Sequence, residues 1–498
     1  MGHISARDLI ESVLDDGTFT GWDDPADHGD VDDAYRSSLE RARAKTGEDE
    51  AVVTGAGEVA GHRVGVICSE FPFLGGSIGA ATARRLIRGI ERATEERLPL
   101  LVSPTSGGTR MQEGTPAFAM MISITAAVAR HKAAALPFLV YLRNPTTGGV
   151  MASWGSSGHL TYGEPGALLG FLGPRVVDLT TGTPMPEGVQ LAEHLHERGI
   201  IDGVVTLGQL RESTRTLVEC VAPADADRPE PAPIAEAEPD GRGAWESILR
   251  TREASRPGGG DVLRALDGGF APLSGTGDGH RDQAIRAGIA RIGGRPVMLI
   301  VQDRHRQPPL GADPMGPGSL RFAQRAIRVA GELGIPVATI IDTPGAELSA
   351  DAEEHAMAGE IARTLTALLD AGVPTVSLIL GQGCGGGALC LLPADRALAM
   401  HDAWMSPLPP EGASAIIHRD IDHAPEMMEA QEVSAEAMAA AGVVDAVVAE
   451  PADPADLPVA ALAAIDRALW ELERDDASRS ASRRSLRLDR YRDFAFRR

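Results

Sequence analysis

Aromatic residues, cysteine and lysine are all scarce in this sequence. Aromatic residues make up 4% of its 498 residues, so we expect a core of Ala, Val, Leu and Ile, a composition that suits helices packed on strands. No two of the four cysteines form a C-x-x-C pair, so neither a zinc ribbon nor a disulfide framework explains the fold. The four are Cys68, Cys220, Cys384 and Cys390.

Positive charge and long apolar runs are also lacking, which excludes two further classes of protein. The formal net charge is −23, and so acidic a chain is a poor candidate for binding nucleic acid. No segment reaches about eighteen consecutive apolar residues, and the N-terminus lacks the apolar stretch of a signal peptide. We therefore expect a cytoplasmic protein with no membrane-spanning segment.

The sequence does contain one pattern that occurs twice. In each half, three apolar runs predict strands, and glycine-rich turns and helical patterns follow them. The predicted strands are 64–68, 98–103 and 137–142 in the first half, and 297–301, 335–341 and 373–380 in the second. Gly107 and Gly148 are 41 residues apart, as are Gly345 and Gly386. Two copies of one α/β unit explain this order best.

The repeat divides the chain into two domains with flanking segments. Residues 222–243 are rich in Pro, Ala and acidic side chains and bury too little apolar surface to fold alone, which predicts a linker. The Arg-rich C-terminus could contact phosphates, but a solvated or partner-docked tail is favoured. The predicted segments are a helical arm at 1–49, a domain at 50–221, the linker at 222–243, a domain at 244–470 and the tail at 471–498.

The glycine turns are the candidate functional feature. A glycine pair between a strand and a helix lets a ligand approach backbone N–H groups, which can hold a phosphate or a developing oxyanion. Gly148–Gly149 and Gly386–Gly387 lack both the P-loop lysine and the G-x-G-x-x-G spacing of a dinucleotide site, which favours the oxyanion. Close packing of helix on strand is the structural alternative for either pair alone, and recurrence at equal spacing weakens it.

These motifs resemble those of a known family. FPFLGGSIG, SGGTRMQEG and LPFLVYLRNPTTGGVMAS resemble the β subunit of bacterial acetyl-CoA carboxylase carboxyltransferase. IPVATIIDTPGAE, GVPTVSLILGQGCGGGAL and SPLPPEGASAI are similar to its α subunit. The resemblance covers roughly 50–205 and 240–450, and it implies both subunits fused in one chain as two tandem crotonase-type α/β domains.

The resemblance implies one oxyanion hole in each domain. Gly148 and Gly149 would hold the thioester carbonyl of acyl-CoA as it becomes an enolate, and Gly386 and Gly387 would hold the ureido oxygen of carboxybiotin. The second pair can also be placed one residue earlier, on Gly385 and Gly386. Loss of CO2 leaves a biotin anion that can itself take the α-proton, so the protein needs no general base. The neighbouring residues expected to bind substrate are Gly75, Gly76, Gly107, Gly108, Arg110, Gly345 and Ala346.

Two parts of a complete carboxylase are missing from the chain. The β subunits of the familiar bacterial enzymes begin with a four-cysteine zinc ribbon, whereas residues 1–50 contain no cysteine, so no zinc is expected. Lys45 and Lys132, the two lysines, lack the flanking methionines of a biotin attachment site, and no nucleotide-binding loop stands out. We therefore expect a partner biotin carboxyl carrier protein to carry the biotin and a biotin carboxylase to carboxylate it.

Several side chains near these motifs have a functional and a plainer interpretation. A packing role is favoured for Cys384 over a nucleophile, and a surface or capping role for His418 over a base. Arg110 and Glu113 either shape the acyl-CoA site or form an ion pair that supports the turn. The arginines that could meet CoA phosphates, or simply line a solvated face, are Arg84, Arg85 and Arg88.

The sequence thus predicts the carboxyltransferase component of a biotin-dependent acyl-CoA carboxylase. Its substrate is acetyl-CoA or propionyl-CoA, its product malonyl-CoA or methylmalonyl-CoA, and a homo-oligomer is expected to pair the two kinds of hole from different chains. Two alternatives remain: a decarboxylase of malonyl-type thioesters on the same fold, and a non-catalytic assembly subunit.

Overall fold

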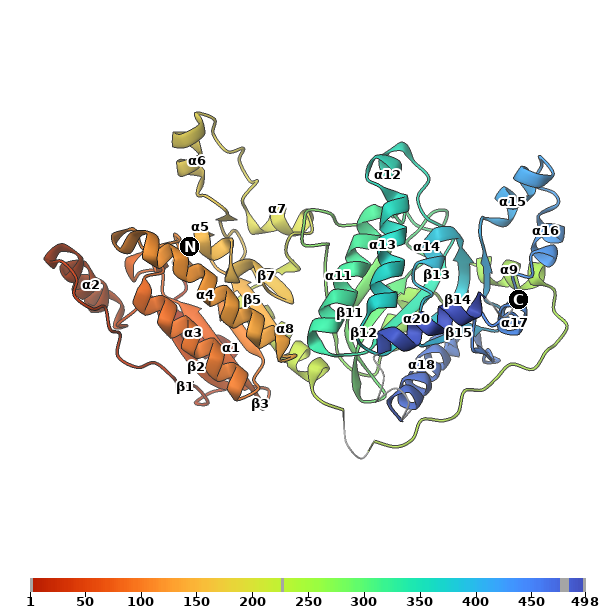
Figure 1. Cartoon of the computed structure of the whole chain (residues 1–498), viewed down its shortest axis with the longest axis horizontal. Helices are drawn as coiled ribbons and strands as arrows, with labels where there is room; N and C mark the ends of the chain where they lie inside the picture. The colour runs from red at the N-terminus through yellow and green to blue at the C-terminus, as the bar shows by residue number, and fades with distance from the viewer. Residues whose placement is uncertain (1–2, 225–227, 475–482, 496–498) are drawn as a thin grey trace. The chain divides into compact units, whose positions relative to one another are not determined.

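The computed structural model describes residues 3–224, 228–474 and 483–495, which form two compact units. The first unit extends to Glu219 and includes Gly277–Gly279, and the second takes in the rest of the chain. Figure 1 labels helices and strands of both units where there is room. No helix in the described part of the chain is both long and apolar enough to cross a membrane.

The first unit is built on a seven-stranded sheet in the order β1-β2-β3-β4-β5-β7-β9. An antiparallel arrangement joins β1, β2 and β3, and the strands from β3 to β9 are parallel. The strands are β1 Thr20–Gly21, β2 Val52–Val59, β3 His62–Ser69, β4 Leu100–Ser103, β5 Phe138–Leu142, β7 Leu160–Gly163 and β9 Gly203–Val204, with a separate pair β6 Thr146–Thr147 and β8 Leu169–Gly170.

Helices α3 and α4 pack side by side on this sheet (Figure 1). Every residue of β5 is buried, as expected for a parallel strand covered on both faces. The core joins Ile67 of β3, Leu86 and Ile90 of α3 and Ile124 of α4, all fully buried. The helices are α1 Ala6–Val13, α2 Asp33–Thr46, α3 Ala80–Glu95, α4 Gly114–Ala133, α5 Gly148–Met151, α6 Pro174–Thr181, α7 Ala192–Glu197 and α8 Leu207–Val221, and short 3-10 turns are Leu74–Gly76, Met111–Glu113 and Trp154–Ser156.

The second unit is built on a sheet in the order β10-β11-β12-β13-β14-β15-β17, with β16 paired to β14. Here too an antiparallel arrangement, β10 to β12, precedes parallel strands from β12 to β17. The strands are β10 Phe270–Pro272, β11 Ile285–Ile292, β12 Arg295–Gln302, β13 Val337–Thr343, β14 Thr375–Cys384, β15 Arg396–Met400, β16 Trp404–Ser406 and β17 Ala446–Val448.

In this unit α11 and α13 are the neighbouring long helices (Figure 1). They correspond in chain order to α3 and α4, because each follows one of the first two parallel strands. The helices are α9 Ala244–Arg252, α10 Gly259–Arg264, α11 Pro317–Leu333, α12 Ala350–Glu354, α13 Met357–Asp370, α14 Gly385–Leu389, α15 Pro410–Ile417, α16 Ala424–Ala430, α17 Ala435–Ala440, α18 Leu457–Arg474 and α20 Arg483–Phe494, with a 3-10 turn at Pro454–Asp456.

The six strands predicted from apolar runs are confirmed as β3, β4, β5, β12, β13 and β14. Residues 235–237 of the predicted linker are more ordered than its composition suggests. The N–H of Ala237 donates to the carbonyl of Val447 at 2.9 Å, and the N–H of Ala449 donates to the carbonyl of Ala235 at 2.7 Å. This part of the linker therefore forms an added edge on β17 and belongs to the second unit.

The Arg-rich tail is not simply solvated. Arg487 of α20 is 1% exposed, and its guanidinium donates to the carbonyls of Leu368 and Ala371, each at 2.8 Å, at the end of α13. It also donates to Asp395 at 2.8 Å. The sequence predicts a solvated or partner-docked tail, whereas residues 483–495 dock on their own chain, because this arginine satisfies carbonyls that a helix C-terminus leaves without intrahelical partners. Residues 475–482 and 496–498 of the predicted tail lie outside the described residues.

Candidate functional site

The first glycine turn lies where β5 leads through β6 into α5. Gly148 opens α5 with φ 66°, a conformation in which glycine alone is unstrained. A Cβ on Gly148 would lie 3.1 Å from the Cα of Gly108, whose own φ is 111°. Glycine at both positions therefore lets the backbone of the SGGT turn lie directly against the start of α5.

Gly149 supplies the N–H that remains available at this turn. The N–H of Gly148 donates to the carbonyl of Phe171 at 2.8 Å, so it is already used. Gly149 lies in the first turn of α5, where N–H groups have no intrahelical acceptor, and it has no other acceptor among the described residues. A Cβ on Gly149 would be 3.6 Å from Oγ1 of Thr109, so this helix start faces the SGGT turn.

The second glycine turn repeats this backbone geometry. Gly385 opens α14 with φ 66°, and Gly345 has φ 136°. Forty residues separate Gly345 from Gly385, as they separate Gly108 from Gly148. By conformation, Gly148 and Gly149 therefore correspond to Gly385 and Gly386, the earlier of the two placements expected from the sequence.

A cavity of about 490 Å³ lies over the second turn. Ala346 and Gly386 are among the residues that line it, and Gly387 is not. Gly387 is buried behind the cavity: its carbonyl accepts a hydrogen bond from Nε2 of Gln302 at 2.7 Å, and a Cβ there would overlap Met315. Of the residues predicted to hold the ureido oxygen, Gly386 reaches the cavity and Gly387 does not.

Two lining residues of this cavity, from separate loops, have backbone N–H groups with no acceptor in the described part of the chain. The N–H groups of Ala346 and Gly386 have no acceptor within the described ranges. The nitrogen of Ala346 lies 3.4 Å from the position of a Cβ on Gly387, so the two loops are in contact. A pair of such donors can stabilise an oxygen that becomes negative during a reaction. Since α14 is only one turn long, a helix dipole would add little to these two donors.

The rest of the cavity is largely apolar and carries no positive side chain. Its lining includes prolines, Met315, Met357 and Ile361, two carboxylates, Glu347 and Glu353, and no lysine, arginine or histidine. An anionic group in this cavity would therefore meet neutral N–H groups and no cationic side chain of this lining. Sequence reasoning missed one polar residue of this lining, Gln307, because it belongs to no motif and reaches the cavity only through the fold of the loop after β12.

Cys384 also lines this cavity, but its chemistry is that of a packing residue. Its side chain is 1% exposed, and burial raises the pKa of the thiol to about 12. The thiol is therefore protonated at neutral pH, whereas a nucleophile needs the thiolate.

Arg110, predicted to bind substrate, is instead part of a buried ion pair. Its side chain is fully buried, and Nη2 lies 2.5 Å from Oε1 of Glu50. Tyr35 and Ser77 accept further hydrogen bonds from the guanidinium. Burial alone would raise the pKa of Glu50, but the hydrogen bonds and charge of Arg110 outweigh it and lower that pKa. The prediction that Arg110 binds substrate is corrected, because all three guanidinium nitrogens donate hydrogen bonds to groups inside the protein.

The other predicted substrate residues of the first unit shape the turns. Gly75 and Gly76 have φ 68° and 61°, and the carbonyl of Gly75 accepts the N–H of Gly107 at 2.9 Å. Arg85 is buried and donates to Asp49 at 2.8 Å. Arg84 and Arg88 line a separate cavity with Asp23, Asp24 and Asp27, acidic neighbours that do not suit a phosphate. His418 is exposed at the end of α15 and stacks on His423, which fits the surface role.

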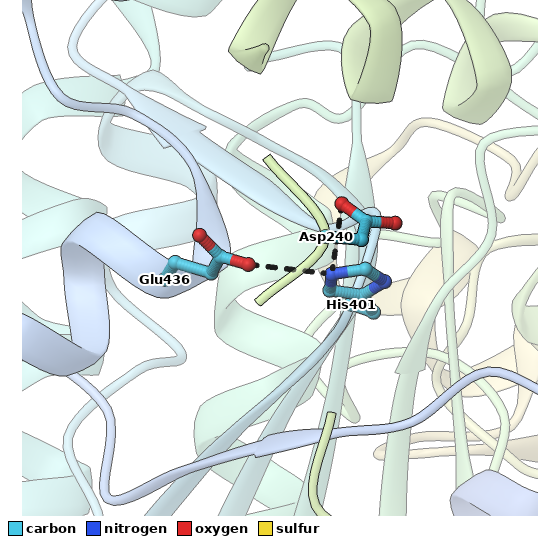
Figure 2. Close-up of side chains that lie close together, drawn as sticks. All are labelled: Asp240, His401 and Glu436. Atoms are coloured by element: carbon cyan, nitrogen blue, oxygen red, sulfur yellow. Dashed lines mark ion pairs between the residues drawn. The ribbon is translucent and has the colours of Figure 1, made fainter. Parts of the chain in front are cut away.

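Among the described residues, one group of three could hold a metal ion: Asp240, His401 and Glu436 (Figure 2). Nε2 of His401 lies 3.9 Å from Asp240 Oδ1 and 3.5 Å from Glu436 Oε1. Both oxygens of Asp240 already accept hydrogen bonds from Arg242, at 3.0 and 2.7 Å. A guanidinium on one of the carboxylates opposes a second cation there, so we interpret the group as ion pairs that hold the predicted linker to the end of β15.

This fold matches solved structures of carboxyltransferases. A structure of transcarboxylase 12S, described as a hexamer with methylmalonyl-coenzyme A and methylmalonic acid bound, superposes with a TM-score of 0.72 at 21% identity. The match covers 94% of this chain and 90% of that chain. A single-chain, multi-domain long-chain acyl-CoA carboxylase gives a TM-score of 0.68 over 91% of this chain and 45% of that one. The molecule therefore has the mixed α/β, crotonase-like fold of a carboxyltransferase.

Sequence comparison gives the family. The family described as the carboxyl transferase domain matches residues 1–483. A probable biotin-dependent acyl-coenzyme A carboxylase beta3 subunit of Mycobacterium tuberculosis is 49% identical over 460 residues, 92% of each chain. The acetyl-coenzyme A carboxylase carboxyl transferase subunits beta/alpha of Salinispora arenicola are 37% identical over 94% of this chain and 86% of that one. The chain belongs to the carboxyl transferase domain family, and it is an acyl-CoA carboxyltransferase, the carboxyl-transferring component of a biotin-dependent carboxylase.

Proposed function

We propose that this chain moves a carboxyl group from carboxybiotin, carried by a partner protein, to the α-carbon of acetyl-CoA or propionyl-CoA. When bound, carboxybiotin supplies the carboxyl group and, once CO2 has left, the base that takes the α-proton. The observation that carries the proposal is the pair of N–H donors, Ala346 and Gly386, at a cavity without a positive side chain. Neutral donors suit a ureido oxygen whose negative charge develops only during the transfer.

The first glycine turn is proposed to hold the acyl thioester. Gly149 has the available N–H, and the neighbouring Thr109 N–H has no acceptor among the described residues, so the two would hold the carbonyl oxygen as it becomes an enolate. Gly108 and Gly148 act through the backbone, since their positive φ values bring these two loops together. No residue of the chain is proposed as a general base.

We further propose that the two units are copies of one α/β unit and that the active site forms between chains of a homo-oligomer. Both sheets have an antiparallel start and a parallel continuation, which supports the first point. Large exposed apolar residues in both units support the second, because interfaces between chains bury such side chains. They are Met111, Phe118, Ile122, Phe171 and Leu179 in the first unit, and Leu348, Leu389, Ile416, Ile417 and Ile421 in the second.

Reconstitution with partners tests the proposal. The purified chain, given ATP, bicarbonate and acetyl-CoA or propionyl-CoA, should form no product by itself. Addition of a cognate biotin carboxylase and biotinylated carrier protein should yield malonyl-CoA or methylmalonyl-CoA. Failure with active cognate partners would favour a non-catalytic assembly subunit, and the ratio of kcat/KM for the two thioesters would identify the acyl group.

A further inference from the structure

The side-chain amide of Gln307 is buried at the cavity with one atom unpaired. Gln307 is 1% exposed and lines the cavity of the second unit. Its Nε2 has no acceptor within hydrogen-bonding distance in the described part of the chain. An unpaired buried N–H lowers stability, so this atom is open to an acceptor that the chain does not supply, a water or a ligand.

Thr343 contacts the oxygen end of this amide. Oγ1 of Thr343 donates its proton to Oε1 of Gln307 at 2.6 Å and accepts the N–H of Gly345 at 3.1 Å. A separation of 2.6 Å suits an O–H···O bond, so the carboxamide oxygen lies on Thr343 and Nε2 is the end without a partner in the described residues. The same hydroxyl thus connects Gln307 to the loop that carries the N–H of Ala346.

A third donor at this cavity has a specific acceptor in the chemistry proposed above. A ureido oxygen has two lone pairs, and the N–H groups of Ala346 and Gly386 can fill both. The remaining oxygens of an N-carboxylated cyclic urea belong to its carboxylate. When the N–C bond breaks, CO2 leaves and the electron pair moves to the ureido oxygen, so the carboxylate loses its charge. A cation on the carboxylate would stabilise the ground state more than the transition state, whereas a neutral amide can orient it at smaller cost.

We propose that Nε2 of Gln307 donates a hydrogen bond to the carboxylate of the N-carboxylated cyclic urea, and that this contact distinguishes the carboxylated from the uncarboxylated carrier. The inference rests on the proposed function. Gln307 is thus a binding residue for the group transferred, separate from the backbone donors that hold the ureido oxygen.

Two variants separate this contact from a purely structural role. Gln307→Met removes the N–H at similar length, and Gln307→Glu keeps an acceptor for Thr343 but places an oxygen where Nε2 was. We expect kcat/KM for the carboxylated carrier to fall about tenfold in Gln307→Met and further in Gln307→Glu, the scale of losing a hydrogen bond to a charged group. The KM for acyl-CoA should not change.

Binding of the uncarboxylated ligand is the decisive readout. Calorimetric affinity for free biotin, which has the ureido oxygen but no carboxylate on its ring, should be unchanged in both variants. The control is Gln382→Met, since Gln382 is 7% exposed, does not line the cavity and pairs its Nε2 with Thr251 at 3.1 Å. It should keep wild-type kcat/KM.

Each contrary result identifies what has failed. Equal losses of biotin affinity and of kcat/KM in Gln307→Met would overturn the inference in favour of simple support of the loop. Full kcat/KM in that variant would also overturn it while leaving the proposed function intact. A wild-type protein that does not use the carboxylated carrier as a substrate would overturn the proposed function and this inference together.

Discussion

At Gly149, a Cβ would lie 3.5 Å from Cγ of Met121, an ordinary contact distance, so the site has room for one methyl group but little more. We expect Gly149→Val to lower turnover by about 10²-fold or more, because a branched side chain would crowd the oxygen that the N–H must reach. Thermal unfolding should show that the fold is retained.

Gly208→Val is the matched control for this prediction. Gly208 is exposed on α8 and has an ordinary φ, and a Cβ added there would have no atom within 4 Å, so its substitution should leave turnover near wild type. Near-normal turnover of soluble Gly149→Val would show that the first glycine turn is not an oxyanion hole.

Individual donors are the part of the site that sequence could not predict. The glycines mark the turns, because only they permit close approach of two backbones, and both turns can be predicted from this pattern. Which N–H stays available depends on distant partners: Phe171 takes that of Gly148, and it follows 23 residues later through a separate loop. For the same reason, the local sequence TRMQEG does not predict that Arg110 is buried against Glu50.

At the scale of elements, a buried carboxylate joins α11 and α13, two neighbouring helices of the second unit. Glu360 of α13 is 4% exposed in its side chain and accepts hydrogen bonds from Arg321 of α11 at 2.8 Å and from Arg363 at 2.6 Å. Burial raises its pKa, but these hydrogen bonds and that of Gln324 outweigh burial and lower it to about 2. The pair of helices is therefore held together by a charge that acid removes.

The sign of the pH effect follows from this lowered pKa. The folded state binds the Glu360 proton more weakly than the unfolded state, whose pKa is 4.5. Its contribution is complete above pH 4.5 and is lost as pH falls toward 2, to a maximum of about 3 kcal/mol. Glu360→Gln should lower the urea midpoint at pH 7 and flatten its decline between pH 5 and pH 3.

The control for this element is Glu40→Gln, at an exposed position on α2. That variant should follow the wild-type pH curve. If Glu360→Gln and the wild type lost stability in parallel as pH fell, the ion pairs between α11 and α13 would not be the cause.

Strands can be predicted better than their surroundings. A parallel strand buried on both faces is a continuous apolar run, which is why the prediction of strands at 137–142 and 373–380 is confirmed by β5 and β14. The edge contact of the linker with β17 and the insertion of Arg487 at the end of α13 depend on tertiary partners, whereas local composition favours solvent for both.

At the scale of the whole molecule, we expect the chain to fold and work without zinc. It has four cysteines, none in a C-x-x-C pair, and its single candidate group within the described residues pairs a carboxylate with Arg242. Mass spectrometry of a chelator-washed sample should find no stoichiometric zinc, and activity should survive the wash. One zinc per chain that is lost together with activity would contradict this, and His401→Ala would test whether it sits at the group in Figure 2.

The central claim is that carboxyl transfer needs biotin as the other substrate, and the reverse half-reaction tests it most directly. Malonyl-CoA or methylmalonyl-CoA is incubated with the purified chain, with and without biotin or biotinylated carrier, and loss of the thioester carboxyl group is followed. We predict decarboxylation that depends on biotin, with free biotin serving poorly because it lacks the positioning that a carrier provides. Equal rates with and without biotin would contradict the account and identify a simple decarboxylase.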